Sequence, residues 1–196
     1  LEFRRVLFRS HPSAFCIPGS DNPKTVEAEL SELEMSALIL DLCGAPRNYQ
    51  APINIHMGCS TGGLVNTMLR FKESLIRMSS RVVDRLVLEN DDKGEWTTHA
   101  LFQHGWSGPI TFDYHHHWCN SGGYSEYEAF SLALASWRQY RPLFHYSEPV
   151  PNATNKRAHC DMPTRVANSY GAFFDLDIEL KAKSASVIAY ENLLNQ

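Results

Sequence analysis

The sequence predicts an α/β fold, in the form of a partial TIM (β/α)8 barrel with about six of its eight βα units. Short apolar runs alternate with helix-like stretches, which indicates βαβ units and a parallel sheet. Positions 56, 89, 113, 145 and 179, at or next to the ends of these runs, lie 33, 24, 32 and 34 residues apart by subtraction, and each interval suits one strand-and-helix unit. Each of these positions holds a residue that can bind a metal, and active sites of TIM barrels lie at that end of the strands.

Five buried strands are expected, and two of them begin with a proline, which suits a first strand position. They cover residues 53–56, 85–89, 109–113, 142–146 and 175–179, and a sixth is expected to end near His11. Apolar residues near helical spacing predict the helices between and after them. These helices cover residues 25–43, 64–78, 127–139 and 187–194.

The chain is divided into a short leading segment and one domain. Residues 1–9, LEFRRVLFR, contain no helix start or turn signal and are interpreted as vector-like or adapter-like sequence, the alternative being a genuine first strand. Residues 10–196 form the predicted domain. The 196 residues, 43% of them hydrophobic, can build one core, but a complete barrel typically needs about 250 residues.

Composition limits the cellular setting without deciding the function. The net charge of −4 argues mildly against DNA binding, although bound divalent cations would offset it locally. The five cysteines include no CxxC pair, which favours a reducing compartment. We find no apolar run near the roughly 20 residues of a membrane span and no convincing signal peptide. We therefore expect a cytoplasmic protein that does not associate with a membrane and needs no obligate protein partner.

The strand ends carry the chemistry. They are His56, Glu89, Asp113, His145 and Glu179. At one barrel mouth these groups would meet, and bare carboxylates would repel one another unless divalent cations used their oxygens as ligands. The alternative is that each is a polar strand end that points to water.

Further histidines enlarge this set. His115, His116 and His117 directly follow Asp113, and on a loop one or two of them are expected to be ligands. His159 can return to the same face. Mixed imidazole and carboxylate ligation favours Mn, Fe or Zn. The candidate ligands are too many for one zinc ion and predict two or three metals suited to phosphoryl chemistry: His11, His56, Glu89, Asp113, His116, His145, His159 and Glu179.

Six segments together resemble the UV-damage endonuclease family. The most specific is RLVLENDDK at residues 85–93, which is similar to the central block of that family. The others, in the family's order and rough spacing, are HPSAF at 11–15, INIHMG at 53–58, FDYHH at 112–116, HYS at 145–147 with RAHCD at 157–161, and IELKAK at 178–183.

The resemblance implies a TIM barrel that holds up to three divalent ions, with Mn2+ favoured, and that nicks duplex DNA immediately 5′ of an ultraviolet photoproduct. It carries the eight candidate ligands over as metal ligands, with Glu89 bridging two ions. It also implies catalytic roles for Glu89 and Lys181, and DNA contacts from Phe15, Tyr114 and Lys183. By the resemblance, the first two strands of about eight are absent, and we expect the chain as given to be unstable or to aggregate unless paired.

The sequence departs from the family pattern at three places. Ala14 stands where the family has a glutamine that probes the lesion, and Leu143 stands where it has a lysine that helps to position the metals. The loop after His56 lacks the tyrosine that the family has there. Two alternative functions therefore stay open, a metal-dependent sugar isomerase or epimerase on the same fold and an inactive DNA-binding relic. Five of the eight candidate ligands are histidines, whereas isomerase sites rely more on carboxylates.

Overall fold

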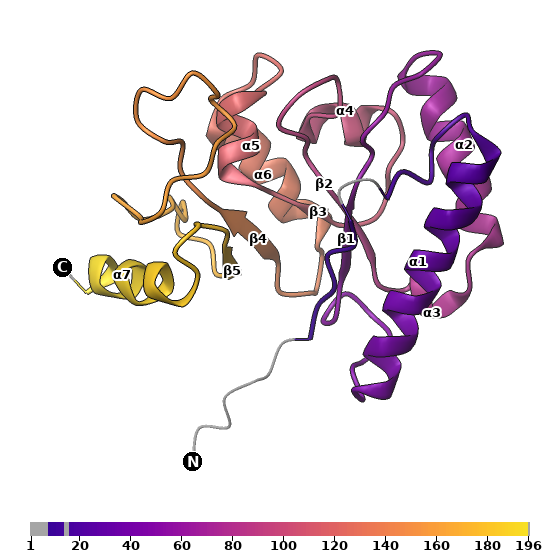
Figure 1. Ribbon diagram of the computed structural model, residues 1–196, viewed down its shortest axis with the longest axis horizontal. Coiled ribbons are helices and arrows are strands. Elements are labelled where there is room, and N and C mark those ends of the chain that lie inside the picture. Colours follow the sequence, from indigo (N-terminus) through magenta and orange to yellow (C-terminus); the bar gives the residue numbers. More distant parts are fainter. Residues whose placement is uncertain (1–7, 14–15, 196) are drawn as a thin grey trace.

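The apolar runs form parallel strands, as the sequence predicts. The computed structural model describes residues 8–13 and 16–195, and Figure 1 shows a mixed α/β chain. Strands β1 (Ile53–His56), β2 (Leu86–Glu89) and β3 (Ile110–Thr111) make one parallel sheet. Strands β4 (Leu143–Tyr146) and β5 (Asp175–Ile178) make a second. Each of the five predicted strands is present, and none of its ends is shifted by more than two residues.

Isolated β-bridges, each of one residue pair, extend the parallel pairing beyond the two small sheets and connect them. Asp113 pairs in parallel with His145, so the end of the β3 segment lies beside β4. Ser10 pairs in parallel with Ile53, so the chain near the expected sixth strand lies beside β1 as an isolated bridge. Strand-like pairing therefore follows the order of the chain from Ser10 to β5. Because all of it is parallel, the carboxyl ends of the strands point the same way.

Four helices match the predicted stretches within three residues at each end. They are α1 (Pro23–Leu42), α2 (Leu64–Arg77), α6 (Glu126–Ser136) and α7 (Ser184–Leu194). The side chain of Asn22 caps α1 by accepting from the amide of Lys24, with proline in the first turn. Ser125 and Glu128 form a reciprocal capping box at the start of α6.

Three short helices are not predicted from the sequence: α3 (Ser80–Val83), α4 (Thr98–Gln103) and α5 (Tyr114–Cys119). The prediction of a loop for the histidine run is wrong, because α5 contains all three histidines. Asp113 caps this helix, with its carboxylate accepting from the amide of His116 at 2.7 Å. Successive side chains on a helix are turned by about 100°, so the three histidines point in different directions.

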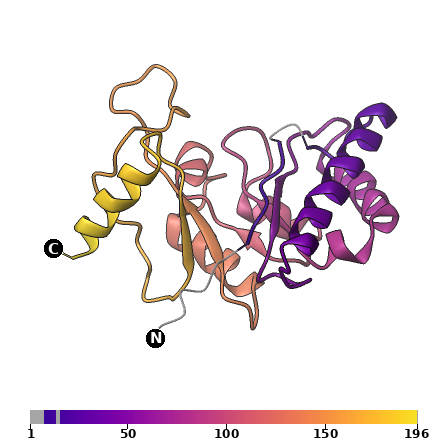
Figure 2. The ribbon, with the colours of Figure 1, turned by 60° about the horizontal axis from the view of Figure 1, so that its bottom comes forward.

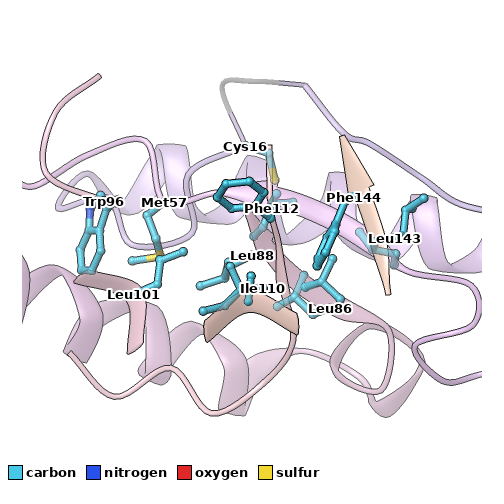
Figure 3. Packing of buried hydrophobic residues seen from close by; sticks show 14 of the residues in the cluster. Cys16, Met57, Leu86, Leu88, Trp96, Leu101, Ile110, Phe112, Leu143 and Phe144 are labelled. Carbon is cyan, nitrogen blue, oxygen red and sulfur yellow. The ribbon is translucent and has the colours of Figure 1, made fainter. Parts of the chain in front are cut away.

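Apolar side chains fill the space between strands and helices (Figure 3). Leu86, Leu88, Ile110, Phe112 and Phe144 are at most 1% exposed. This packing orders the strands, and the order of the strands fixes the residues at their ends. Full burial of such a side chain stabilises the fold by about 1.5–3 kcal/mol.

A buried arginine fixes the opposite end of β2. Arg85 is fully buried, and its guanidinium donates to the carbonyls of Ala45 and Pro46 at 2.8 and 2.9 Å. Asp41 on α1 lies 2.8 Å from the same guanidinium. A buried charge is tolerated only when it is paired and hydrogen-bonded. Arg85 therefore ties the amino end of β2 to α1, four residues from Glu89 at the other end.

The helices flank the strands unequally. Figures 1 and 2 agree that α1, α2 and α3 lie on the β1 side, whereas α7 lies at the far end beside β5. Among helices of the described residues, none combines the length and apolar character that crossing a bilayer requires.

Candidate metal centre

Glu89 is the centre of the predicted site. It ends β2, its side chain is fully buried, and it pairs in register with His56 at the end of β1. Imidazole nitrogens of four histidines lie around its two carboxylate oxygens. The closest nitrogen-to-oxygen distances from Glu89 are 3.4 Å to His11, 3.8 Å to His56, 3.0 Å to His116 and 3.1 Å to His145. The amide of Asn54 also donates to Glu89.

Two further carboxylates lie beside this group. Glu179, one residue beyond β5, lies 3.2 Å from Nδ1 of His145. Asp113 lies 4.0 Å from Nδ1 of His116. Ligand atoms fall within 4.8 Å of one another in three overlapping sets: His11, His56 and Glu89; His11, His145 and Glu179; Glu89, Asp113 and His116. The structure thus brings together seven of the eight predicted ligands.

Several buried atoms in this cluster have no hydrogen bond. Within the described residues, nothing is aligned to hydrogen-bond with Oε1 of Glu89, Oδ2 of Asp113 or Nδ1 of His145, although charged groups lie close to them. Leaving buried polar atoms unsatisfied costs about 1–3 kcal/mol each. A shared divalent cation would use the carboxylate lone pairs, and a neutral histidine would offer its own. The donor set, mixed nitrogen and oxygen, therefore fits such ions.

The charges of the cluster depend on one another. Burial lowers the pKa of His145, but Glu89 and Glu179 raise it by more, to about 9. Burial likewise lowers the pKa of His116, while Asp113 and Glu89 raise it to about 11. Burial raises the pKa of Glu89, yet the surrounding imidazoles hold it well below its usual value. Protons therefore occupy His116 and His145 in the absence of metal, and metal ions must displace them.

The other predicted histidines lie further out. His159 is not in any of the three sets, and its ring centroid lies 6.5 Å from that of His116. Its Nδ1 lies 2.8 Å from the carbonyl of Glu179, so Nε2 is the nitrogen that could bind an ion. On α5, His115 turns toward Trp118 and His159, and His117 packs against Phe112. Within the histidine run, the structure brings only His116 to Glu89.

The predicted DNA-contacting and catalytic residues are placed unequally. Lys181 and Lys183 are exposed and follow Glu179 closely. Tyr114 is only 5% exposed, and its hydroxyl donates to the carbonyl of Asn168 at 2.7 Å. That placement suits a packing residue better than a DNA contact. Phe15 lies outside the described residues.

Three polar residues next to the cluster were not predicted. Asp91 lies 2.7 Å from Nδ1 of His56, and Asn54 donates to Glu89. Asn90 exchanges hydrogen bonds with the backbone of Asp113. All three are buried. Asn90 and Asp91 belong to the RLVLENDDK segment, whose polar run directly after a buried strand was the signal available in the sequence.

An open pocket of about 600 Å³ lies beside the cluster. His56, His116 and Asp91 line it on one side, and Trp96, Lys93 and Arg157 are also in its wall. The pocket gives a substrate access to one edge of the buried cluster. Fold and site together define an α/β protein with an imidazole and carboxylate cluster fitted to divalent cations.

Comparison with known proteins names the family. The profile described as UV-endonuclease UvdE matches residues 3–195. A UV-damage endonuclease of Neurospora crassa is 30% identical over 197 residues, covering 93% of this chain and 30% of the relative. A UV DNA damage endonuclease of Bacillus cereus strain Q1 is 28% identical over 198 residues, covering 95% and 61%. The crystal structure of SacUVDE superposes with a TM-score of 0.80 at 27% identity, covering 95% of this chain and 64% of that one.

The chain belongs to the UvdE family of UV endonucleases. The resemblance found in its motifs is therefore confirmed. The chain spans 61% of the length of the Bacillus relative and 30% of the Neurospora one. The match begins at residue 3, so it includes most of the leading segment interpreted as vector-like, and that interpretation stays a prediction.

Proposed function

We propose that this chain carries the metal centre of a DNA repair endonuclease that nicks duplex DNA on the 5′ side of ultraviolet photoproducts. The observation that carries the proposal is the fully buried Glu89 with imidazole nitrogens of four histidines within 3.8 Å of its oxygens. Family membership supplies the substrate class. The same membership favours an endonuclease over a sugar isomerase.

The metal centre is proposed to hold two or three divalent ions, with Mn2+ favoured. Glu89 would bridge two of them, since its two oxygens face different histidines: Oε1 faces His116, and Oε2 faces His11, His56 and His145. Glu179 and Asp113 would complete the sets on either side, and His159 would join through its Nε2. Ions held there would supply Lewis-acid activation of water and neutralise charge on the phosphate.

The protein's own groups have three tasks in this proposal. The core beneath β1 to β4 fixes the ligands before any ion arrives, so little reorganisation is needed. The pocket beside His56 and His116 admits a phosphodiester to the edge of the cluster. Lys181 is proposed as a group that orients water or phosphate, and Lys183 as a phosphate contact, because both are exposed just beyond Glu179. Phe15 stays a proposed lesion contact.

The chain is further proposed to form part of a TIM barrel whose domain spans residues 10–196. The pairing order from Ser10 to β5 and the likeness to SacUVDE support this proposal. Leu143 begins β4 and lies two residues before His145, so both side chains share one face of the strand. Leucine offers no ligand atom there. The cluster must therefore work without the lysine of the family pattern.

The test uses supercoiled plasmid, ultraviolet-irradiated or not, incubated with the protein and Mn2+. We expect nicking of the irradiated plasmid only, its loss with a chelator, and its loss in Glu89→Gln. Glu191→Gln, an exposed residue on α7 away from the pocket, is the control and should nick normally. Equal nicking of both plasmids would contradict lesion specificity. Binding of Mn2+ without any nicking would support the inactive relic instead.

A further inference from the structure

Four of the predicted histidine ligands are hydrogen-bonded through Nδ1 to an oxygen acceptor. His116 faces the carbonyl of Asn90 at 3.0 Å as well as Glu89, and the other three share one arrangement. Nδ1 of His11 lies 3.0 Å from the carbonyl of Pro12, Nδ1 of His159 lies 2.8 Å from the carbonyl of Glu179, and Nδ1 of His56 lies 2.7 Å from Oδ1 of Asp91. A carbonyl or ionised carboxylate can only accept, so each Nδ1 must carry the proton. When such a ring is neutral, Nε2 therefore has the lone pair that a cation can use. In His11 and His56 this Nε2 faces Glu89.

Asp91 is the only side chain among these three acceptors. The other two are backbone carbonyls, which no substitution removes. Asp91 is 8% exposed, and its second oxygen accepts from the amide of Gly58 at 3.2 Å. Gly58 has a φ of +65°, a conformation that favours glycine, and lies two residues beyond His56. One carboxylate therefore holds both the ring of His56 and the turn that follows it.

The backbone of Asp91 is held as firmly as its side chain. Its amide donates to the carbonyl of Trp96 at 2.8 Å, and the side chain of Asn120 donates to its carbonyl at 3.0 Å. Asp92, the next residue, lines the same pocket but differs in the group that its carboxylate holds. Its carboxylate pairs with Arg157, which is about half exposed, and it does not touch a histidine in the described residues.

We infer that Asp91 is a positioning residue that fixes the tautomer and ring orientation of His56 for metal binding. The inference rests on the proposed metal centre and adds to it a residue that touches no ion. A carboxylate behind a ligating histidine orients the ring and makes Nε2 a better donor, and loss of such a partner typically lowers metal affinity about 10–100-fold. Asp91 also lines the open pocket, so its substitution would alter the cluster on the side where a substrate would enter.

The experiment compares Asp91→Ala and Asp91→Asn with Asp92→Asn as the matched control. Titration calorimetry with Mn2+ should show affinity reduced about 10–100-fold in Asp91→Ala, a smaller loss in Asp91→Asn, whose amide oxygen can still accept, and no change in Asp92→Asn. Nitrogen-15 NMR of the metal-free proteins, recorded at a pH at which the His56 ring is neutral, should show His56 protonated at Nδ1 in the wild type and a mixture of tautomers in Asp91→Ala. A merely structural residue would not move this tautomer.

The outcomes separate the inference from the proposed function. If the wild type binds no Mn2+, the proposed metal centre fails, while the tautomer comparison still tests the role of Asp91. If the wild type binds and both Asp91 variants keep its affinity and its His56 tautomer, the inference is overturned. Should Asp91→Ala fail to fold by circular dichroism, Asp91→Asn with the same two readouts decides the matter.

Discussion

The two sheets contribute ligands to the same cluster but are built differently. Every residue of β2 is buried, and Glu89 at its end is fully enclosed. Every residue of β5 is only partly buried, and the Glu179 side chain beyond it is 31% exposed. The hydrophobic core therefore fixes the position of Glu89, whereas the strand that leads to Glu179 is less buried. We therefore expect metal ions to order the β5 side more than the β2 side.

The largest expected effect is on the enclosed side. Glu89→Gln should lower Mn2+ affinity by more than about 100-fold, because loss of an outer partner alone costs 10–100-fold and Glu89 lies at the centre of the histidines. Calorimetric titration measures this, with Glu191→Gln as control. A normal Mn2+ titration in Glu89→Gln would place the ions elsewhere.

The two strands can be compared by their packing. Leu88→Ala in β2 should lower the free energy of unfolding by about 2–5 kcal/mol, the range for a fully buried leucine. Leu176→Ala in β5 should cost less than about 1.5 kcal/mol, because the side chain is already partly hydrated. Urea denaturation measures both variants. Equal losses would remove the contrast between the sheets.

On the exposed side, Glu179→Gln should weaken Mn2+ binding on the order of 10-fold, which is about 1.4 kcal/mol. The number of ions bound should fall by one while the rest stay, since Glu89 still holds its own set. Mass spectrometry under native conditions counts the ions, and Glu191→Gln on α7, also exposed, serves as control. Loss of every ion would show that the two sides are not independent.

The smallest effect concerns pH. In the metal-free protein the pKa of His145 is raised from 6.5 to about 9, so its pairing stabilises the fold fully below 6.5 and is lost as the pH rises through about 9. The urea midpoint without metal should therefore fall across that range. With Mn2+ the stabilisation by metal should grow instead, since fewer protons compete for the histidines. A metal-free midpoint that rises with pH would contradict the charge pattern.

Much of the fold follows from the sequence because its strands are apolar runs with sharp limits. Pro109 and Pro142 directly precede β3 and β4, β1 and β2 end on the ligand-type residues His56 and Glu89, and β5 ends one residue before Glu179. The short helices α3 to α5 were missed since four to six residues are too few for a helical period to be visible. The run of histidines was predicted to be a loop because helices were predicted from the spacing of apolar residues. The helix there begins instead at the Asp113 cap, which this spacing does not reveal.

The sequence predicted those ligands that lie at or next to the ends of strands. Chain order and parallel pairing alone bring His56, Glu89 and His145 to one end of the sheets. Asp91 and Asn54 were not predictable, because an outer partner is defined by what it touches and not by its place in a motif. The position of His159 depends on how residues 147–174 fold back, and that long loop has no periodic signal.

The most direct test of the shared metal centre is a crystal of this chain soaked in Mn2+ and measured at an X-ray wavelength where manganese scatters anomalously. The account predicts two or three anomalous peaks, each bonded to Glu89 or Glu179 and to at least one of His11, His56, His116 and His145. Peaks only at surface carboxylates, with the Glu89 cluster free of metal, would contradict it.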